Sequence, residues 1–378
     1  TYPDLHLFIN GEWRKTASDI PVVNPATEEE IGRLPHADKG DLDDALAAAE
    51  SGFKIWSRTP PVERATVLVK AAALMRQRQE EIAAAITLEH GKPITQARLE
   101  VVRGCEFFEW DAGEATRTYG RVIPSAPGVR HVVHHQPIGI VAAFSPWNFP
   151  MSQPCRKVAG AIAAGCSIIL KASEETPAGA LHIARALHDA GLPPGVLNLV
   201  FGEPAEISDH LIKQDPVRLV AFTGSTRVGQ HLTILAAQHM TPVLMELGGH
   251  APVIVCEDTD VETAAISGAI RKMRNAGQVC TSPTRFFVHQ SIFEQYADAF
   301  VNRAAETIVG NGFEPGVEMG PLANERRADA LAALVEDAVA NGAELRTGGS
   351  RMEGKGFFCE PTVLVNVPAH AQFMQVEP

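Results

Sequence analysis

The sequence of 378 residues predicts an α/β protein, built on parallel sheets that helices cover on both faces. From Pro137 onward, short apolar runs at Ile138–Phe144, Ser167–Leu170, Val196–Phe201 and Leu219–Phe222 alternate with helical segments that begin near a proline or a polar cap. Strands that are apolar throughout are typical of buried parallel sheets. Ligands of such sheets bind at the carboxyl ends of the strands, where we expect the functional residues.

The segments on either side of this series predict one further layer and one further domain. Residues 41–118 are predicted to be helical, with Asp41 capping Leu42–Phe53 and Pro60–Pro61 opening a second helix. A second α/β domain is expected after Gly248-Gly249. Its predicted elements are a strand at Pro252–Cys256, a helix at about Asp260–Asn275, a strand near Phe286–Val288, and helices at 291–308 and 325–341.

Composition excludes several classes of protein. The 33 basic and 45 acidic residues give a formal net charge of −12, which is a poor match to nucleic acid. The longest apolar stretch, Val158–Leu170, contains two glycines and falls short of the roughly 20 residues of a membrane span. The N-terminus lacks the pattern of a secretory signal, which predicts a cytoplasmic protein. The ending Glu377-Pro378 carries no terminal element, so we expect the natural chain to continue.

Three residues are candidates for catalysis. Cys280 follows a glycine-containing turn, where backbone N–H groups can stabilise an anion, although a buried structural cysteine fits the same seven residues. Glu246 ends an apolar strand and is either a solvated strand-end charge or a general base in a dry cleft. Asn148 lies between two prolines at a strand end, which suits an oxyanion-hole donor or an ordinary turn. The six cysteines form no metal-binding pattern and predict free thiols.

Two further strand ends are candidates for binding a nucleotide. Phe222–Gly229 is a strand-turn-helix junction whose free N–H groups could hold a pyrophosphate, although it is neither a GxGxxG motif nor a P-loop. Lys171 and Glu174 follow the strand predicted at Ser167–Leu170, where the carboxylate could accept hydrogen bonds from both ribose hydroxyls. A solvated, charged loop is the alternative for that pair.

Together with Leu7–Trp13 and the final Glu-Pro, these segments resemble the aldehyde dehydrogenase superfamily, closest to succinate-semialdehyde dehydrogenase. The resemblance implies a nucleophile at Cys280, a general base at Glu246, and an oxyanion hole made by Asn148 and the Cys280 N–H. It implies two doubly wound parallel-sheet domains and a β-hairpin oligomerisation arm. Residues 1–117 and 136–245 would form the NAD-binding domain, 118–135 the arm and 246–378 the catalytic domain, in a homodimer or homotetramer.

The same resemblance implies a nicotinamide cofactor and no metal. The residues that it assigns to the cofactor are Ser145, Trp147, Lys171, Ser173, Glu174, Gly202, Gly224, Ser225, Leu247 and Glu377. Glu377 would bind the nicotinamide ribose and Gly224-Ser225 the pyrophosphate. Because Glu174 should repel a 2′-phosphate, we expect NAD to be preferred, with NADP as a secondary cofactor.

Two arginines point to a carboxylated aldehyde. Arg274 and Arg156 match positions that clamp the distal carboxylate in succinate-semialdehyde dehydrogenases, and arginine suits bidentate carboxylate recognition. The continuation Cys280-Thr281-Ser282-Pro283 departs from that subfamily's Cys-Val-Cys. We therefore expect oxidation of succinate semialdehyde through a Cys280 thioester. The alternatives are glutarate or 2-oxoglutarate semialdehyde, a neutral aldehyde, or a non-catalytic structural relative.

Overall fold

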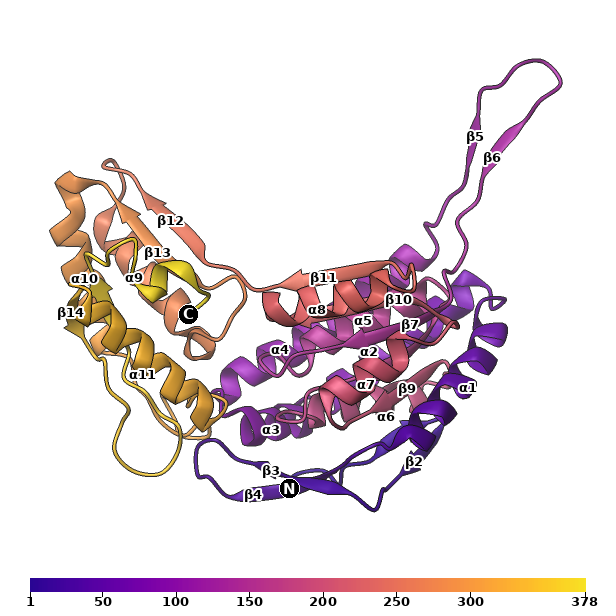
Figure 1. The fold of residues 1–378 in the computed structure, drawn as a ribbon, viewed down its shortest axis with the longest axis horizontal. Helices are drawn as coiled ribbons and strands as arrows, with labels where there is room; N and C mark the ends of the chain where they lie inside the picture. Colours follow the sequence, from indigo (N-terminus) through magenta and orange to yellow (C-terminus); the bar gives the residue numbers. More distant parts are fainter. The chain divides into compact units, whose positions relative to one another are not determined.

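The computed structural model describes residues 1–378 and divides them into two compact units (Figure 1). Unit 1 comprises Thr1–Val22, Gly32–Ala85 and Arg98–Glu246, and unit 2 comprises Val23–Ile31, Ile86–Ala97 and Leu247–Pro378. Two short segments of the N-terminal region thus belong to the same unit as Cys280. The chain passes from one unit to the other between Glu246 and Leu247.

Unit 1 is built on a seven-stranded sheet with the order β11-β10-β7-β8-β9-β1-β2. Strands β7 (Ile140–Phe144), β8 (Ser167–Lys171), β9 (Leu197–Val200) and β10 (Val217–Gly224) correspond to the four predicted apolar runs. Strand β8 is parallel to β7 and β9, and β10 is parallel to β7. The predicted parallel sheet is confirmed, and it places four strand ends at one edge.

One side of this sheet is antiparallel, which the sequence analysis did not predict. Strand β1 (Leu7–Ile9) pairs antiparallel with β9 and with β2 (Glu12–Arg14). Asn10 and Gly11 join β1 to β2 with φ values of 52° and 81°. Two consecutive residues in this left-handed region form the kind of turn that closes a two-residue hairpin.

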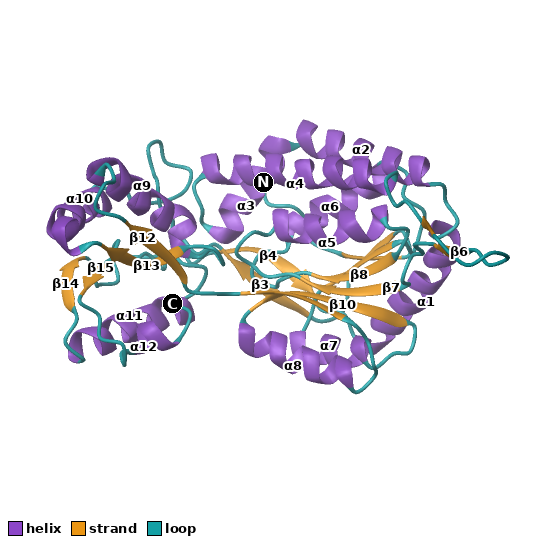
Figure 2. Ribbon diagram, turned by 90° about the horizontal axis from the view of Figure 1, so that it is seen from above, coloured by secondary structure: helices purple, strands orange, loops and turns teal.

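Helices cover both faces of the sheet (Figure 2). On one face lie α2 (Pro61–Gln77), α5 (Ser152–Ala163) and α6 (Ala178–Asp189). On the other lie α1 (Lys39–Trp56), α7 (Pro204–Ile212) and α8 (Thr226–Ala237). Helices α3 (Gln79–His90) and α4 (Ile94–Ala115) complete the predicted helical region. No helix is both long enough and apolar enough to cross a bilayer.

The start of α1 corrects one prediction. Asp38, not Asp41, is the N-cap, and its side chain accepts a hydrogen bond of 2.9 Å from the Asp41 N–H. Asp41 is the third helical residue and accepts in return from the Asp38 N–H at 3.1 Å. Both residues are acids that suit a cap, and the reciprocal pair forms a capping box that begins the helix three residues earlier than predicted.

Three short strand pairs complete the secondary structure outside the main sheets. Strands β5 (Arg121–Ile123) and β6 (His131–Val133) form an antiparallel hairpin that extends away from the rest of unit 1 (Figure 1). Strands β3 (Asp19–Val23) and β4 (Glu30–Pro35) form a second pair. In unit 2, β14 (Glu344–Thr347) pairs antiparallel with β15 (Val363–Val365). The first of these hairpins lies within the predicted arm.

Unit 2 contains a parallel pair of strands, β12 (Ala251–Val255) and β13 (Pro283–Val288), linked through α9 (Val261–Met273). Its core is formed by side chains of α9, β13 and α10 (Phe293–Ala305), among them Met273, Tyr296 and Phe300. Helices α11 (Glu325–Ala340) and α12 (Gln372–Gln375) follow. The predicted helix at Asp260–Asn275 ends at Met273, because Asn275 and Ala276 leave helical geometry.

Candidate active site

The carboxyl ends of β7 and β8 bring two predicted cofactor residues together in unit 1. Phe144 is the register partner of Lys171, so the next residue, Ser145, lies beside the end of β8. The Ser145 N–H donates to the Lys171 carbonyl at 3.1 Å. Further along the turn, the Thr176 hydroxyl donates to the Trp147 carbonyl at 3.0 Å, which ties the Ser145–Pro150 segment to the loop after β8.

Lys171 and Glu174 form an ion pair at the same edge. Lys171 is buried, and this burial lowers the pKa of its ammonium, while the Glu174 carboxylate opposes the shift. The bond uses Oε1 of Glu174, so Oε2 retains its capacity to accept a hydrogen bond. The pair therefore combines a fixed cation with a carboxylate that can accept from a hydroxyl-rich ligand.

The end of β10 leads directly into α8. Ser225 is the N-cap of that helix, and its side chain accepts from the Val228 N–H at 3.4 Å. The Phe222 ring occupies the position that a side chain at residue 224 would need, which explains the glycine there. Two other groups at this edge, the buried hydroxyls of Ser145 and Thr223, have no hydrogen-bond partner in the chain. Such groups fit a polar ligand that supplies their partners.

Glu246 and Lys157 interact within unit 1. Glu246 is exposed near the end of β11 (Val243–Leu247), a strand that is only half-buried and not the buried strand implied by its apolar sequence. Burial lowers the pKa of Lys157, on α5, to about 8, and the nearby Glu246 carboxylate opposes that shift. The structure thus provides the candidate base with a cationic neighbour that the sequence analysis did not identify.

Cys280 lies in unit 2 on a turn formed by residues 274–282, here called the cysteine turn. Asn275, Ala276 and Gly277 have φ values of 55°, 52° and 73°, so three consecutive residues adopt the left-handed conformation. For a residue other than glycine this conformation costs about 1–2 kcal/mol. Such strain persists only when surrounding contacts impose it, and it is frequent at functional sites.

Hydrogen bonds from distant residues hold the cysteine turn. The Asn275 N–H donates to Gln96 Oε1 at 3.0 Å, and Gln96 Nε2 donates to the Glu318 carbonyl at 2.9 Å. The Gln278 side chain donates to the Asn275 carbonyl at 3.1 Å and accepts from the Ala323 N–H at 3.1 Å. Gln96 was missed by the sequence analysis, because nothing in the sequence links it to a turn 179 residues away.

Cys280 differs in burial from the other cysteines of the chain. Cys280 is half-buried, whereas Cys105, Cys155, Cys166 and Cys359 are buried; Cys256 is exposed. The Gly249 backbone is close to Cys280, since a side chain at residue 249 would lie 3.9 Å from the Cys280 carbonyl. Cys280 is therefore not a fully buried cysteine.

Glu377 lies against the same segment of unit 2. Its carboxylate occupies the space that a side chain at Gly248 would fill, so a larger residue there would displace the Glu377 side chain. Leu247, Gly248 and Gly249 thus connect Glu377 to Cys280. The predicted site residues in unit 2 are Leu247, Arg274, Cys280 and Glu377, and those in unit 1 are Ser145, Trp147, Asn148, Arg156, Lys171, Ser173, Glu174, Gly202, Gly224, Ser225 and Glu246.

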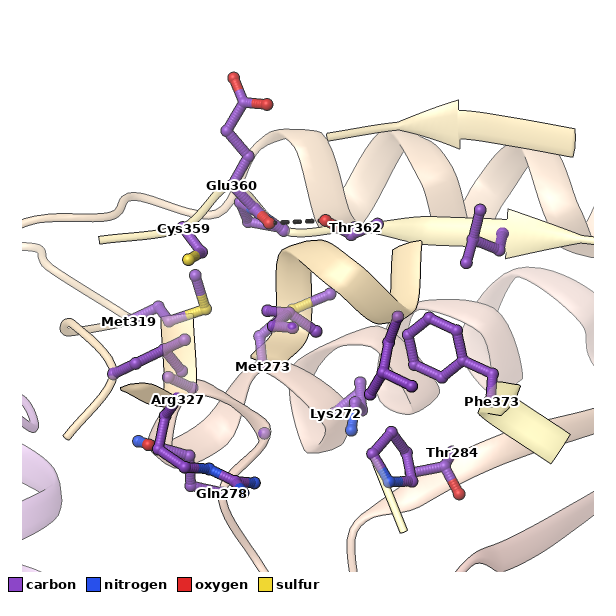
Figure 3. Close-up of a pocket in the computed structure, with 18 of the residues that line it drawn as sticks. Lys272, Met273, Gln278, Thr284, Met319, Arg327, Cys359, Glu360, Thr362 and Phe373 are labelled. Atoms are coloured by element: carbon purple, nitrogen blue, oxygen red, sulfur yellow. Dashed lines mark hydrogen bonds between the residues drawn. The ribbon is translucent and has the colours of Figure 1, made fainter. Parts of the chain in front are cut away.

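A cavity of about 240 Å³ lies beside the cysteine turn (Figure 3). Gln278, Lys272 and Phe373 are among its lining residues, but Cys280 is not. Lys272 Nζ donates to Ser282 Oγ at 3.2 Å, and burial lowers the pKa of Lys272 to about 8. The cavity adjoins the cysteine turn through Ala276, Gly277 and Gln278.

The two predicted substrate arginines lie in different units. Arg156, on α5 of unit 1, is exposed, and its guanidinium lies 4.4 Å from the centre of the Phe107 ring. Arg274 is exposed at the end of α9 in unit 2, where its N–H donates to the Ile270 carbonyl. Both side chains are exposed to solvent, where an anionic ligand can reach them.

Comparisons with known proteins identify the family of the chain. The model of the aldehyde dehydrogenase family matches residues 13–378. A 4-(hydroxymethyl)benzenesulfonate dehydrogenase of Comamonas testosteroni is 45% identical over 98% of this chain and 78% of its own. A glutarate-semialdehyde dehydrogenase of Pseudomonas putida is 38% identical over 98% and 77%.

Two solved structures have the same fold. A succinate-semialdehyde dehydrogenase from Burkholderia pseudomallei has a TM-score of 0.95 and 38% identity, covering 97% of this chain and 77% of that chain. An aldehyde dehydrogenase from Bacillus cereus in an NAD+ complex has a TM-score of 0.96 and 34% identity, covering 99% and 77%.

Proposed function

The chain belongs to the aldehyde dehydrogenase family, and from this premise we propose that it oxidises an aldehyde bearing an anionic group, succinate semialdehyde foremost, with NAD. The observation that carries the proposal is the half-buried Cys280 on a strained turn that distant hydrogen bonds hold in place. A thiol that is accessible and fixed in position can attack a carbonyl carbon.

In the proposed mechanism, Cys280 and Asn148 act on the aldehyde and Glu246 acts on water. The Cys280 thiolate forms a C–S bond with the carbonyl carbon, and the Asn148 amide and the Cys280 N–H stabilise the oxyanion. Loss of one such donor typically costs about 10²–10³ in rate. When bound, the nicotinamide cofactor supplies the oxidising equivalent that yields the thioester. Glu246 then takes a proton from the water that hydrolyses this thioester, and cleavage of the C–S bond releases the acid and restores the Cys280 thiolate.

NAD fits the residues at the carboxyl edge of the sheet in unit 1. The Lys171–Glu174 pair, the N-terminus of α8 and the unpartnered hydroxyls of Ser145 and Thr223 are the groups that would bind it. Gly202, which has a φ of 143°, follows β9 at this edge. Trp147, Ser173, Leu247 and Glu377 complete the proposed set, and Glu377 would bind the nicotinamide ribose.

The preference between NAD and NADP tests the role of Glu174. The carboxylate should repel a 2′-phosphate, so kcat/KM with NAD is expected to exceed that with NADP. Replacing Glu174→Gln should narrow this difference, because the amide keeps the shape but removes the charge. Steady-state rates with both cofactors measure it. A wild-type enzyme that prefers NADP contradicts the argument.

The substrate proposal rests on Arg156, Arg274 and the names of the relatives. One relative is named for a sulfonate and another for a semialdehyde of a dicarboxylic acid, so an anionic group remote from the reacting carbon is common to both. Exposed guanidinium groups can bind either anion. A sulfonated aldehyde is therefore the second candidate, ahead of 2-oxoglutarate semialdehyde or a neutral aldehyde.

A panel of aldehydes with and without an anionic group tests the substrate. For Arg274→Ala, kcat/KM for succinate semialdehyde should fall about 30-fold or more, as expected for losing one partner of a charged pair, with butanal nearly unaffected. Arg271→Ala, at another exposed arginine of α9, is the matched control. Equal losses with both aldehydes would argue against an anion clamp. Absence of NAD or NADP reduction with every aldehyde would instead support a non-catalytic relative.

A further inference from the structure

Helices α4 and α5 of unit 1 pack along a line of contacts that ends at Asp111. Glu100 Oε1 accepts hydrogen bonds from the N–H groups of Met151 at 2.9 Å and Ser152 at 3.2 Å. One turn further along α4, Gly104 lies beside Cys155. Residues 100, 104, 107 and 111 of α4 share one face at helical spacing, so Phe107 and Asp111 meet the next turns of α5.

Two residues at the end of this line, Phe107 and Asp111, lie near Arg156. Phe107 lies beneath its guanidinium at 4.4 Å, and Asp111 is close enough to interact electrostatically. On α5, Asp111 Oδ2 lies 3.7 Å from where a side chain at Gly160 would begin. The Asp111 carboxylate therefore lies near Arg156, the arginine that we propose as an anion clamp.

We propose that Asp111 determines substrate specificity by setting the electrostatic potential that an anionic substrate meets at Arg156. The inference rests on the proposed function, since it deepens the role of Arg156. While Asp111 is ionised, its carboxylate competes with the anionic group of the substrate for the guanidinium. When Asp111 is protonated or replaced by a neutral residue, Arg156 attracts that anion more strongly.

The charges around Asp111 determine the pH at which this change occurs. Burial raises the pKa of Asp111 to about 6, and the Glu114 carboxylate on the same helix adds to the increase, whereas Arg156 on α5 opposes it. Lys157, next to Arg156 on α5, contributes further positive charge to that helix. Asp111 is thus mostly ionised at pH 7.5 and mostly protonated at pH 5. Affinity for an anionic aldehyde should increase as the pH falls through 6.

The test compares wild type with Asp111→Asn at pH 7.5 and at pH 5.5. At pH 7.5 the variant should have a KM for succinate semialdehyde that is about three- to five-fold lower, the effect expected of one partly exposed charge pair. At pH 5.5 the difference should shrink, and the KM for butanal should be the same in both proteins. Glu109→Gln, at an exposed acid of α4 that pairs with Arg76, is the matched control and should leave these KM values unchanged.

A binding measurement keeps this inference separate from the proposed function. Titration calorimetry with succinate should show tighter binding to Asp111→Asn than to wild type at pH 7.5, and no such gain in Arg156→Ala/Asp111→Asn. If no aldehyde is oxidised but this binding pattern holds, the proposed function fails and the role of Asp111 stands. Equal KM values and equal succinate affinities in wild type and Asp111→Asn would overturn the inference. A gain that persists without Arg156 would overturn it as well.

Discussion

His182 shows how burial controls a titratable side chain in this protein. It lies on α6, is 1% exposed, and neither ring nitrogen has a hydrogen-bond partner. Burial lowers the pKa of His182 to about 4, and the charges of Arg185 and Arg78 act in the same direction. The folded protein therefore keeps this imidazole neutral, whereas the unfolded chain protonates it near pH 6.5.

This difference predicts a pH dependence of stability. Above pH 6.5 His182 is neutral in both states, and its contribution to the free energy of unfolding is fully present. As the pH falls from 6.5 toward 4, only the unfolded chain binds the proton, so the free energy of unfolding decreases by about 3 kcal/mol at most. His182→Leu, which is similar in volume and cannot be protonated, should lose less stability between pH 7.5 and pH 5 than wild type does. Urea unfolding at both pH values measures this. Replacing the exposed His239→Gln should leave the wild-type dependence intact.

Single residues also show which parts of the site can be predicted from sequence. Cys280 and Asn148 stand in local motifs, so neighbouring residues were enough to identify them as candidates, whereas Glu377 was assigned only through the family resemblance. Gln96 and Asp111 carry no such signal, because their roles arise from contacts that bring α4 near the cysteine turn and α5. Positions that support a site through packing require the structure, since sequence spacing does not record their partners.

At the scale of elements, the strands were predicted better than the helix boundaries. Strands β7 to β10 each contain a buried apolar run because helices cover both faces, and this pattern is visible in the sequence. The start of α1 depended on which of two nearby acids caps the helix, Asp38 or Asp41, and both fit. The end of α9 depended on the left-handed conformation of Asn275 and Ala276, which hydrogen bonds from other segments impose.

The capping box of α1 provides a test at this scale. Asp38→Ala removes the acceptor for the Asp41 N–H, and loss of such a cap costs about 1 kcal/mol. We expect the free energy of unfolding of unit 1 to fall by that amount, measured by urea unfolding at pH 7.5. Lys39→Ala, at an exposed position in the first turn, should have little effect. If Asp41→Ala alone destabilises while Asp38→Ala does not, the assignment of the cap is wrong.

At the scale of the whole molecule, the β5–β6 hairpin exposes apolar side chains. Val122 is 69% exposed and Val132 is 44% exposed. An exposed hairpin with apolar side chains and unpaired edges invites pairing with another chain. By its resemblance to the oligomerisation arm of the family, the hairpin of this chain is expected to be covered by a second copy in a homodimer or homotetramer.

Introducing charge into the hairpin tests whether it mediates assembly. Val122→Lys/Val132→Lys keeps the backbone pairing but places two cations where an apolar partner would bind, so we expect a smaller assembly than that of wild type. Light scattering coupled to size-exclusion chromatography measures the mass. Val69→Lys, at an exposed position of α2, should leave the mass unchanged and so exclude a general effect of added charge. An arm variant with the mass of wild type, or a monomeric wild type, would show that the hairpin does not hold the subunits together.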